Sequence, residues 1–165
     1  MMTLQNIILI ITGTTTALSA GVFYTWSCAV IPGMARLSNT EYIRAMQSFN
    51  SAIQNPIFFI SFLGTAVLLP VCSYLHYNPV ITNRFWFLLA ATIIYLIGVL
   101  GVTIFGNIPL NENLAGFNLQ TALPETIALQ RTKFEIPWNN LNTIRTVSSI
   151  LAIILVIIAC IKAES

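Results

Sequence analysis

The sequence predicts an all-α integral membrane protein, a bundle of four membrane-spanning helices. Of its 165 residues, 56% are hydrophobic and only 7% are charged, whereas about 25% of the residues of a soluble domain are charged. The mean hydropathy is +0.82. Four apolar runs are long enough to cross the hydrocarbon core, which takes about 20 residues. We expect one domain, residues 1–165, with spans at about 4–31, 56–74, 84–105 and 142–161.

The first span, residues 4–31, carries no charge, and Pro32-Gly33 is expected to end its helix. A cleaved signal peptide is not expected, because no basic residue precedes the run and the run is too long. Small residues that suit generic helix packing recur at every fourth position: Gly13, Ala17 and Gly21.

The connection after the first span contains a predicted amphipathic helix. Ser38-Asn39-Thr40-Glu41 has the pattern of a capping box, so a helix is expected to begin there. Asn55-Pro56 is expected to end this segment and begin the second span, because asparagine caps helices and proline suits their first turn. The helix has one apolar face, which indicates a position near the membrane surface: Ile43, Met46, Phe49 and Ile53.

The second and third spans are joined by a short turn near His76, which we expect at the surface or interface. Pro70 is expected to kink the second span. Arg84 and Trp86 are expected to anchor the third span at headgroup depth. Pro109 is expected to make the third helix fray near its end, because proline has no amide to donate.

A polar connection, residues 107–141, precedes the fourth span, and Pro124-Glu125 suits the first turn of a short helix there. The even number of spans places both termini on one face and both long connections on the other. Arg36, Arg44, Arg131 and Lys133 in those connections weakly favour a cytoplasmic position for them.

Charge and composition exclude several functional classes. The net charge of +2 is not concentrated in any run, so no nucleic-acid partner is expected. Cys28, Cys72 and Cys160 show no metal or redox spacing and suit buried hydrophobic positions. The single histidine provides no cluster for haem, copper or iron, so no metal site is expected, and no Walker or GxGxxG pattern indicates a nucleotide-binding fold.

Polar residues beside the fourth span are the main candidates for a site. Trp138, Asn142, Arg145 and Ser149 are spaced by four, three and four, which places them on one stripe if the helix extends back to Trp138. Arg145 would lie about one turn inside the span, where a charge is costly unless it faces a cavity or partner. The alternative is that Arg145 snorkels to the headgroups.

Further polar residues lie on the same side of the membrane. Asn107 and Asn111 flank Pro109 and supply both donors and acceptors, although one of them would serve simply as a helix cap. Capping explains Asn55, and a solvated face would explain Asn50. Together these residues would form a pocket with the Arg145 stripe.

These motifs resemble the anthrone oxygenase-like family of small four-span membrane proteins. The resemblance covers almost the whole chain and rests on GNIPLNENL after the third span and on W-x-x-x-N-x-x-R-T, which runs from Trp138 to Thr146. Leu141 stands where an aromatic residue is expected before the motif asparagine, so the substrate is not carried over from the family.

The resemblance implies a cofactor-independent oxygenase acting on an anthrone-like or other polyphenolic aromatic with dioxygen. Arg145 would stabilise a substrate anion, with Asn107, Asn111 and Asn142 hydrogen-bonding its oxygens and Trp138 stacking on its ring. Asn50 and Asn55 would complete the substrate-binding set, and Glu112 is the nearest candidate for a base.

The alternative is a non-enzymatic small membrane protein that binds lipid, quinone or a partner protein through the same polar face. Both hypotheses expect a hydrophobic small molecule and membrane lipid as partners, and no residue pattern specifies an oligomeric state. The expected location is a multi-pass position in a membrane, the inner membrane if the source is bacterial.

Overall fold

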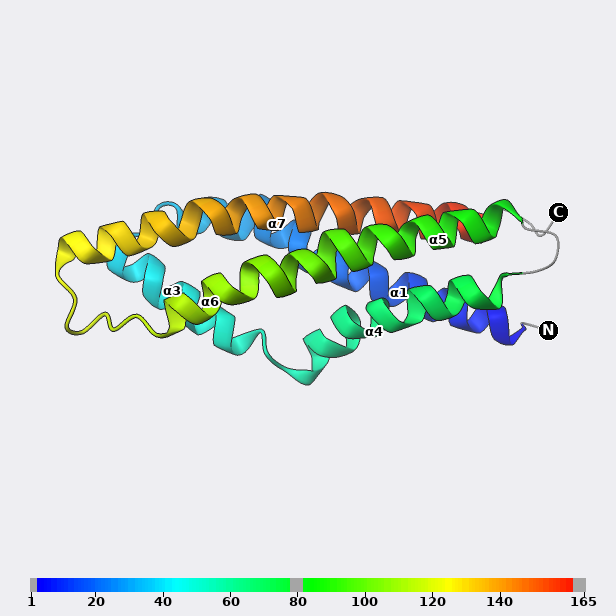
Figure 1. Ribbon diagram of the computed structural model, residues 1–165, viewed down its shortest axis with the longest axis horizontal. Helices are drawn as coiled ribbons and strands as arrows, with labels where there is room; N and C mark the ends of the chain where they lie inside the picture. The colour runs from blue at the N-terminus through cyan, green and yellow to red at the C-terminus, as the bar shows by residue number, and fades with distance from the viewer. Residues whose placement is uncertain (1–2, 78–81, 162–165) are drawn as a thin grey trace.

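The structure is a computed structural model that describes residues 3–77 and 82–161. Four long helices run side by side, and the start of α1 lies at the same end as the end of α7 (Figure 1). All four are long and apolar enough to cross a membrane: Leu4–Met34, Pro56–Leu75, Asn83–Ala115 and Pro124–Ile161. The predicted four-span helical bundle is therefore confirmed.

The helices form an up-down-up-down bundle in which each packs against two others. Contacts join α1 (Leu4–Thr25) to α4 (Pro56–Leu75), α4 to α5 (Asn83–Tyr95), α5 to α7 (Pro124–Ile161), and α7 back to α1. Packing of sequential helices against each other is typical of up-down-up-down bundles. The buried apolar residues include Leu69, Leu88 and Val156.

The first and third helices continue past prolines that were predicted to end or fray them. π-helical segments precede both prolines: η1 (Trp26–Val30) leads into α2 (Ile31–Met34), and η3 (Thr103–Asn107) leads into α6 (Ile108–Ala115). A further π-helical segment, η2 (Leu96–Gly101), lies after α5. The first helix ends at Met34, one residue after the predicted stop at Pro32-Gly33, whereas the prediction that the third helix frays at Pro109 is wrong, because that helix continues to Ala115.

The physical reason is the wider turn immediately ahead of each proline ring. The Ile31 amide donates to Trp26 O, and the Ile108 amide donates to Thr103 O, so each bond spans five residues instead of four. The extra residue in a π-turn relieves the crowding that a proline ring causes in a regular α-helix. Pro70 and Pro137 also lie inside continuous helices.

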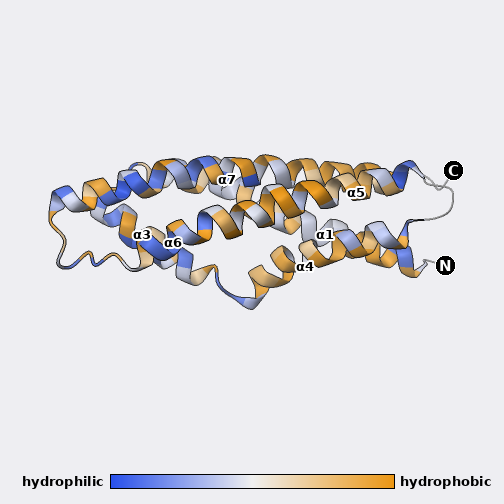
Figure 2. Cartoon of the chain, viewed as in Figure 1, coloured by the Kyte–Doolittle hydropathy of each residue, from blue (hydrophilic) through white to orange (hydrophobic). Residues whose placement is uncertain are grey.

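The two long connections differ from each other. The first contains the predicted helix, α3 (Asn39–Ala52), and its capping box is formed by Ser38 and Glu41. The second contains no separate short helix, because α6 and the 38-residue α7 extend the spans and leave residues 116–123 between them. Figure 2 shows hydrophilic residues gathered over α3, α6 and the first half of α7, and apolar residues over the other end.

Three further expectations are corrected. His76 is buried, with Nδ1 2.8 Å from Cys72 O, instead of lying at the surface. Arg84 is also buried, and its Nε donates to Ala159 O at 3.0 Å, so its side chain packs against α7 instead of facing outward as an anchor. Within the row of small residues, a Cβ on Gly13 would contact Val156, whereas Ala17 and Gly21 are exposed.

Candidate functional site

The predicted stripe on the fourth helix is present and faces the interior of the bundle. Because α7 extends back beyond Trp138, the spacing of four, three and four places all four side chains on one buried face. Trp138 is 4% exposed, Arg145 is 7% exposed, and Asn142 and Ser149 are fully buried. Arg145 therefore does not snorkel to the headgroups.

Among the described residues, all the partners of Arg145 are neutral. Its Nη2 donates to Asn142 Oδ1 at 2.9 Å, and its Nη1 lies 3.5 Å from Thr103 Oγ1. The guanidinium carbon lies 4.8 Å from the centre of the Phe23 ring and 5.3 Å from that of Trp138, distances that allow cation–π attraction. Its Nε is buried without a hydrogen-bond partner. A charge held this way within a membrane segment favours an anionic ligand.

Asn142 fixes the position of Arg145 through a directional chain of hydrogen bonds. Because arginine only donates, the oxygen of the Asn142 amide must face Arg145, and its Nδ2 donates to Ser27 Oγ at 3.0 Å. Ser27 and Thr146 share a bond of 2.8 Å, and the Thr146 hydroxyl donates back to carbonyl oxygens of Phe23 and Asn142. This chain joins η1 to α7 beside the guanidinium group.

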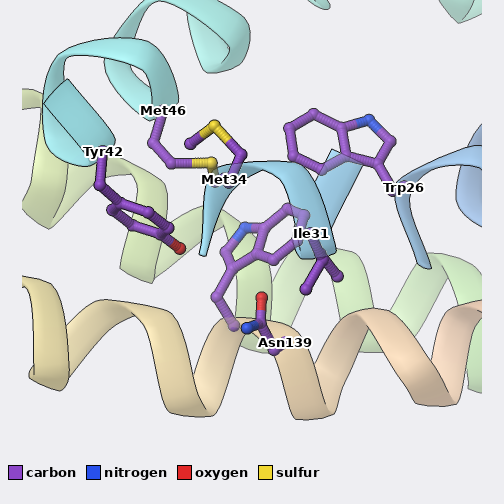
Figure 3. Close-up of a pocket in the computed structure, with 7 residues that line it drawn as sticks. Trp26, Ile31, Met34, Tyr42, Met46 and Asn139 are labelled. Atoms are coloured by element: carbon purple, nitrogen blue, oxygen red, sulfur yellow. The ribbon is translucent and has the colours of Figure 1, made fainter. Parts of the chain in front are cut away.

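Trp138 joins the stripe to the third helix and to the first. Its Nε1 donates to Asn111 Oδ1 at 2.9 Å, and its ring centre lies 5.1 Å from that of Trp26. Figure 3 shows the tightly packed space above α7, where Met34 and Met46 lie between Tyr42 and Trp26. This space does not admit a water molecule. It therefore forms a closed wall behind the two tryptophans.

A cavity of about 820 Å³ lies in front of these tryptophans. All four long helices and α3 contribute to its lining. Five of the predicted site residues line it: Asn50, Asn111, Glu112, Trp138 and Arg145. Aromatic residues also line it: Phe23, Trp26, Phe58, Phe59 and Phe62.

Three predicted site residues lie outside the lining of this cavity. Asn142 does not line the cavity but accepts a hydrogen bond from Arg145, which does. Asn107 is fully buried, and both polar atoms of its amide lack hydrogen-bond partners. Asn55 caps α4, because its Oδ1 accepts from the Phe58 amide at 3.0 Å and its Nδ2 donates to Ala52 O.

The α3 helix, which carries Asn50, is held against α7 by Arg131. Arg131 Nη1 donates to Leu37 O at 2.7 Å, and its Nε donates to Glu135 Oε2 at 2.7 Å. The guanidinium carbon also lies 4.5 Å from the centre of the Tyr42 ring. Burial, together with the charge of Glu135, raises the pKa of the Tyr42 hydroxyl, which therefore stays neutral in this contact.

Sequence reasoning did not identify several residues that build the site. Phe23, Trp26 and Ser27 come from the first helix, and Thr103 comes from the third. The position of Thr103, one turn before Asn107, was a usable signal, because residues four apart share a helix face. The first-helix residues carried no comparable signal.

Among residues 3–77 and 82–161, no three histidine, cysteine, aspartate or glutamate side chains are grouped so that they could hold a metal ion.

Comparison with protein families matched residues 58–155 to the anthrone oxygenase family model. The matched segment includes Asn107, Asn111, Glu112, Trp138, Asn142 and Arg145, and it begins after Asn50 and Asn55. No curated protein and no solved structure matched the chain. Since the matched segment is more than half of the chain, the protein belongs to the anthrone oxygenase family.

Proposed function

We propose that this protein is a membrane-bound oxygenase that oxidises a planar, anthrone-like polyphenol with dioxygen and without a cofactor. The observation that carries the proposal is the buried, uncompensated charge of Arg145 at the wall of an aromatic cavity. Membership of the anthrone oxygenase family supports an oxygenase role, and the cavity supports the class of substrate.

The cavity suits a planar aromatic molecule in size and chemistry. Small-molecule pockets typically enclose about 300–1,000 Å³ and place a few polar groups among apolar walls. The volume of about 820 Å³ lies within this range, and Trp138 and Phe23 flank the guanidinium group. A phenolate or enolate oxygen would gain more from Arg145 there than in water, because the surroundings are poor in dipoles.

The proposed chemistry balances without an external reductant. A base removes a proton from the methylene carbon between the rings, and the resulting enolate passes one electron to dioxygen. The substrate radical and superoxide then combine, forming the carbon–oxygen bond, and protonation gives a hydroperoxide. Loss of the second proton from that carbon breaks the oxygen–oxygen bond and releases water. One atom of dioxygen enters the quinone, and the substrate supplies every electron that dioxygen accepts.

The predicted residues at the cavity have separate roles in this scheme. Arg145 stabilises the enolate, and Asn142 holds Arg145 in place. Asn111 uses its oxygen for Trp138 Nε1, so its Nδ2 can donate to a substrate oxygen. Glu112 is the proposed base, because it is the acidic residue in the cavity lining. Asn50 also lines the cavity, whereas Asn107 and Asn55 lie outside its lining, so no contact with the substrate is proposed for them.

The test is dioxygen uptake by the purified protein supplied with emodin anthrone. We expect Arg145→Ala to lower the turnover number by about 10²–10³-fold, the typical loss when a donor to a developing oxyanion is removed. Arg44→Ala is the matched control, because Arg44 is exposed on α3 and outside the cavity. Membrane expression should be equal in both variants.

Two outcomes would contradict parts of this proposal. Undiminished turnover in Arg145→Ala would remove Arg145 from the mechanism. Tight binding of emodin anthrone without any dioxygen uptake by the unaltered protein would favour the alternative, a non-enzymatic protein that binds lipid or quinone in the same cavity.

A further inference from the structure

The cavity opens through a mouth with two chemically different sides. On one side lie exposed apolar side chains of the spans, Phe59 on α4 and Ile108 on α6, each 40% exposed. On the other side lie exposed polar residues: Ser51 on α3, Gln54 between α3 and α4, and Glu112 on α6. The apolar side faces where acyl chains would lie, and the polar side faces the membrane surface.

This mouth follows from the unequal lengths of the helices. The span Asn83–Ala115 has 33 residues and α4 has 20, so at 1.5 Å per residue the third helix is longer by roughly 20 Å. The α6 helix contacts α3 and α7, whereas α4 packs on α1 and α5 further along the bundle. The first turns of α4 therefore stand apart from α6, and the cavity lies between them.

Burial along the cavity indicates how a ligand would be oriented. The lining changes from the exposed Phe59 and Ile108 at the mouth to Phe62, Trp138 and Arg145, which are 5%, 4% and 7% exposed. The charged group is thus at the inner end, and the apolar side of the mouth is at the outer end. A ligand with one acidic or hydrogen-bonding edge would place that edge inward and its apolar edge toward lipid.

We infer that the cavity takes its ligand directly from the bilayer, through the opening between Phe59 and Ile108, with the polar edge leading. The ligand class is a membrane-dissolved planar phenol, and an apolar tail on its trailing edge would extend into the acyl chains. The ligand chemistry rests on the function proposed above, whereas the lateral opening rests on the lining residues alone.

The opening can be tested without any substrate, using the intrinsic tryptophans. Trp26 and Trp138 line the cavity, and Trp86 is 55% exposed on α5 and does not line it. In a Trp86→Phe protein the fluorescence therefore reports on the cavity. The protein is placed in phosphatidylcholine nanodiscs whose acyl chains are brominated near the headgroup, and emission is compared with that in unbrominated nanodiscs.

A matched pair of variants separates the two sides of the mouth. Ile108→Phe adds bulk on the apolar side, and Ser51→Phe adds a similar ring on the polar side. We expect brominated lipid to quench the Trp86→Phe protein, Ile108→Phe to restore most of the lost emission, and Ser51→Phe to restore little. Absence of quenching, or equal recovery in both variants, would overturn the lateral opening.

A second measurement keeps this inference separate from the oxygenase proposal. With emodin anthrone in the bilayer, Ile108→Phe should slow dioxygen uptake more than Ser51→Phe does. Quenching that follows the expected pattern while no variant consumes dioxygen would refute the oxygenase proposal and leave the lateral opening in place. Recovery of emission in Ser51→Phe but not in Ile108→Phe would refute the lateral opening alone.

Discussion

At the scale of single residues, Arg145 depends on one amide for its shortest hydrogen bond. The bond to Asn142 Oδ1 is 2.9 Å long, and the other contact, to Thr103, is 3.5 Å. A hydrogen bond to a charged group contributes about 1.5–3 kcal/mol to stability. Asn142 is therefore expected to matter for stability as well as for position.

We predict that Asn142→Leu lowers the free energy of unfolding by about 2–3 kcal/mol. Ser27→Ala is the control, with an expected loss of about 1 kcal/mol, because it removes the partner of Asn142 Nδ2 but leaves the bond from Arg145 to Asn142 Oδ1 in place. Unfolding of the purified protein by sodium dodecyl sulfate in mixed micelles, followed by circular dichroism, measures both. Equal losses in the two variants would show that Arg145 does not depend on Asn142.

The residues of the stripe were predictable from the sequence, whereas their partners were not. Trp138, Asn142 and Arg145 share a face through helix geometry alone, which needs no tertiary information. Ser27 and Thr103 lie on other helices, and their contacts depend on how each helix is rotated in the bundle. That rotation is decided by packing across the whole interface, which no local pattern in the sequence records.

At the scale of the helices, the prolines show where a local rule was overridden. Proline disfavours the regular α-helix, so Pro32 and Pro109 were expected to interrupt their helices. Each proline is nevertheless part of its helix, because a π-turn precedes it; the first helix then ends at Met34, and the third continues to Ala115. Both π-turns contribute residues to the site. In a membrane, a continuous helix also avoids exposing unpaired backbone groups to lipid.

Packing between α7 and the third helix gives a prediction about glycine. A Cβ on Gly98 would lie 2.7 Å from Ser148 Cβ, so the two backbones are too close for any larger residue. We expect Gly98→Ala to destabilise the bundle by about 1–3 kcal/mol, the usual cost of overpacking. Gly21→Ala is the matched control, because a Cβ there meets nothing within 4 Å.

Thermal unfolding in detergent measures both alanine variants, and a compensating change tests the cause. Adding Ser148→Gly to Gly98→Ala should recover most of the lost stability, because it removes the side-chain atoms that the new Cβ would contact. Similar stability of Gly98→Ala and Gly21→Ala, or no recovery in the double variant, would show that the helices can separate at little cost.

At the scale of the whole molecule, an even number of spans was enough to predict that both long connections share one face. The hydrophobic runs determine the number of crossings, because each must cover the hydrocarbon thickness. The order in which helices neighbour one another was not predictable in this way, nor was the mouth of the cavity. Both depend on relative helix lengths, and α6 and α7 extend further than their apolar runs indicated.

The distribution of positive charge predicts the orientation of the molecule. Arg36, Arg44 and Lys133 are exposed at the end that carries α3, whereas Arg84 lies at the other end. Because positive residues near spans are retained in the cytoplasm, we expect the α3 end to be cytoplasmic. A reporter fused after residue 165 would then lie outside the cytoplasm.

In a bacterial host, a carboxyl-terminal alkaline phosphatase fusion should therefore be active, and a green fluorescent protein fusion should be dark. Replacing Arg36, Arg44 and Lys133 with glutamine should weaken this bias and give activity from both reporters. Arg36→Lys, Arg44→Lys and Lys133→Arg together form the control, because they keep the charges and should keep the orientation. A fluorescent fusion of the unaltered protein would reverse the orientation and place the polar side of the cavity mouth outside the cytoplasm.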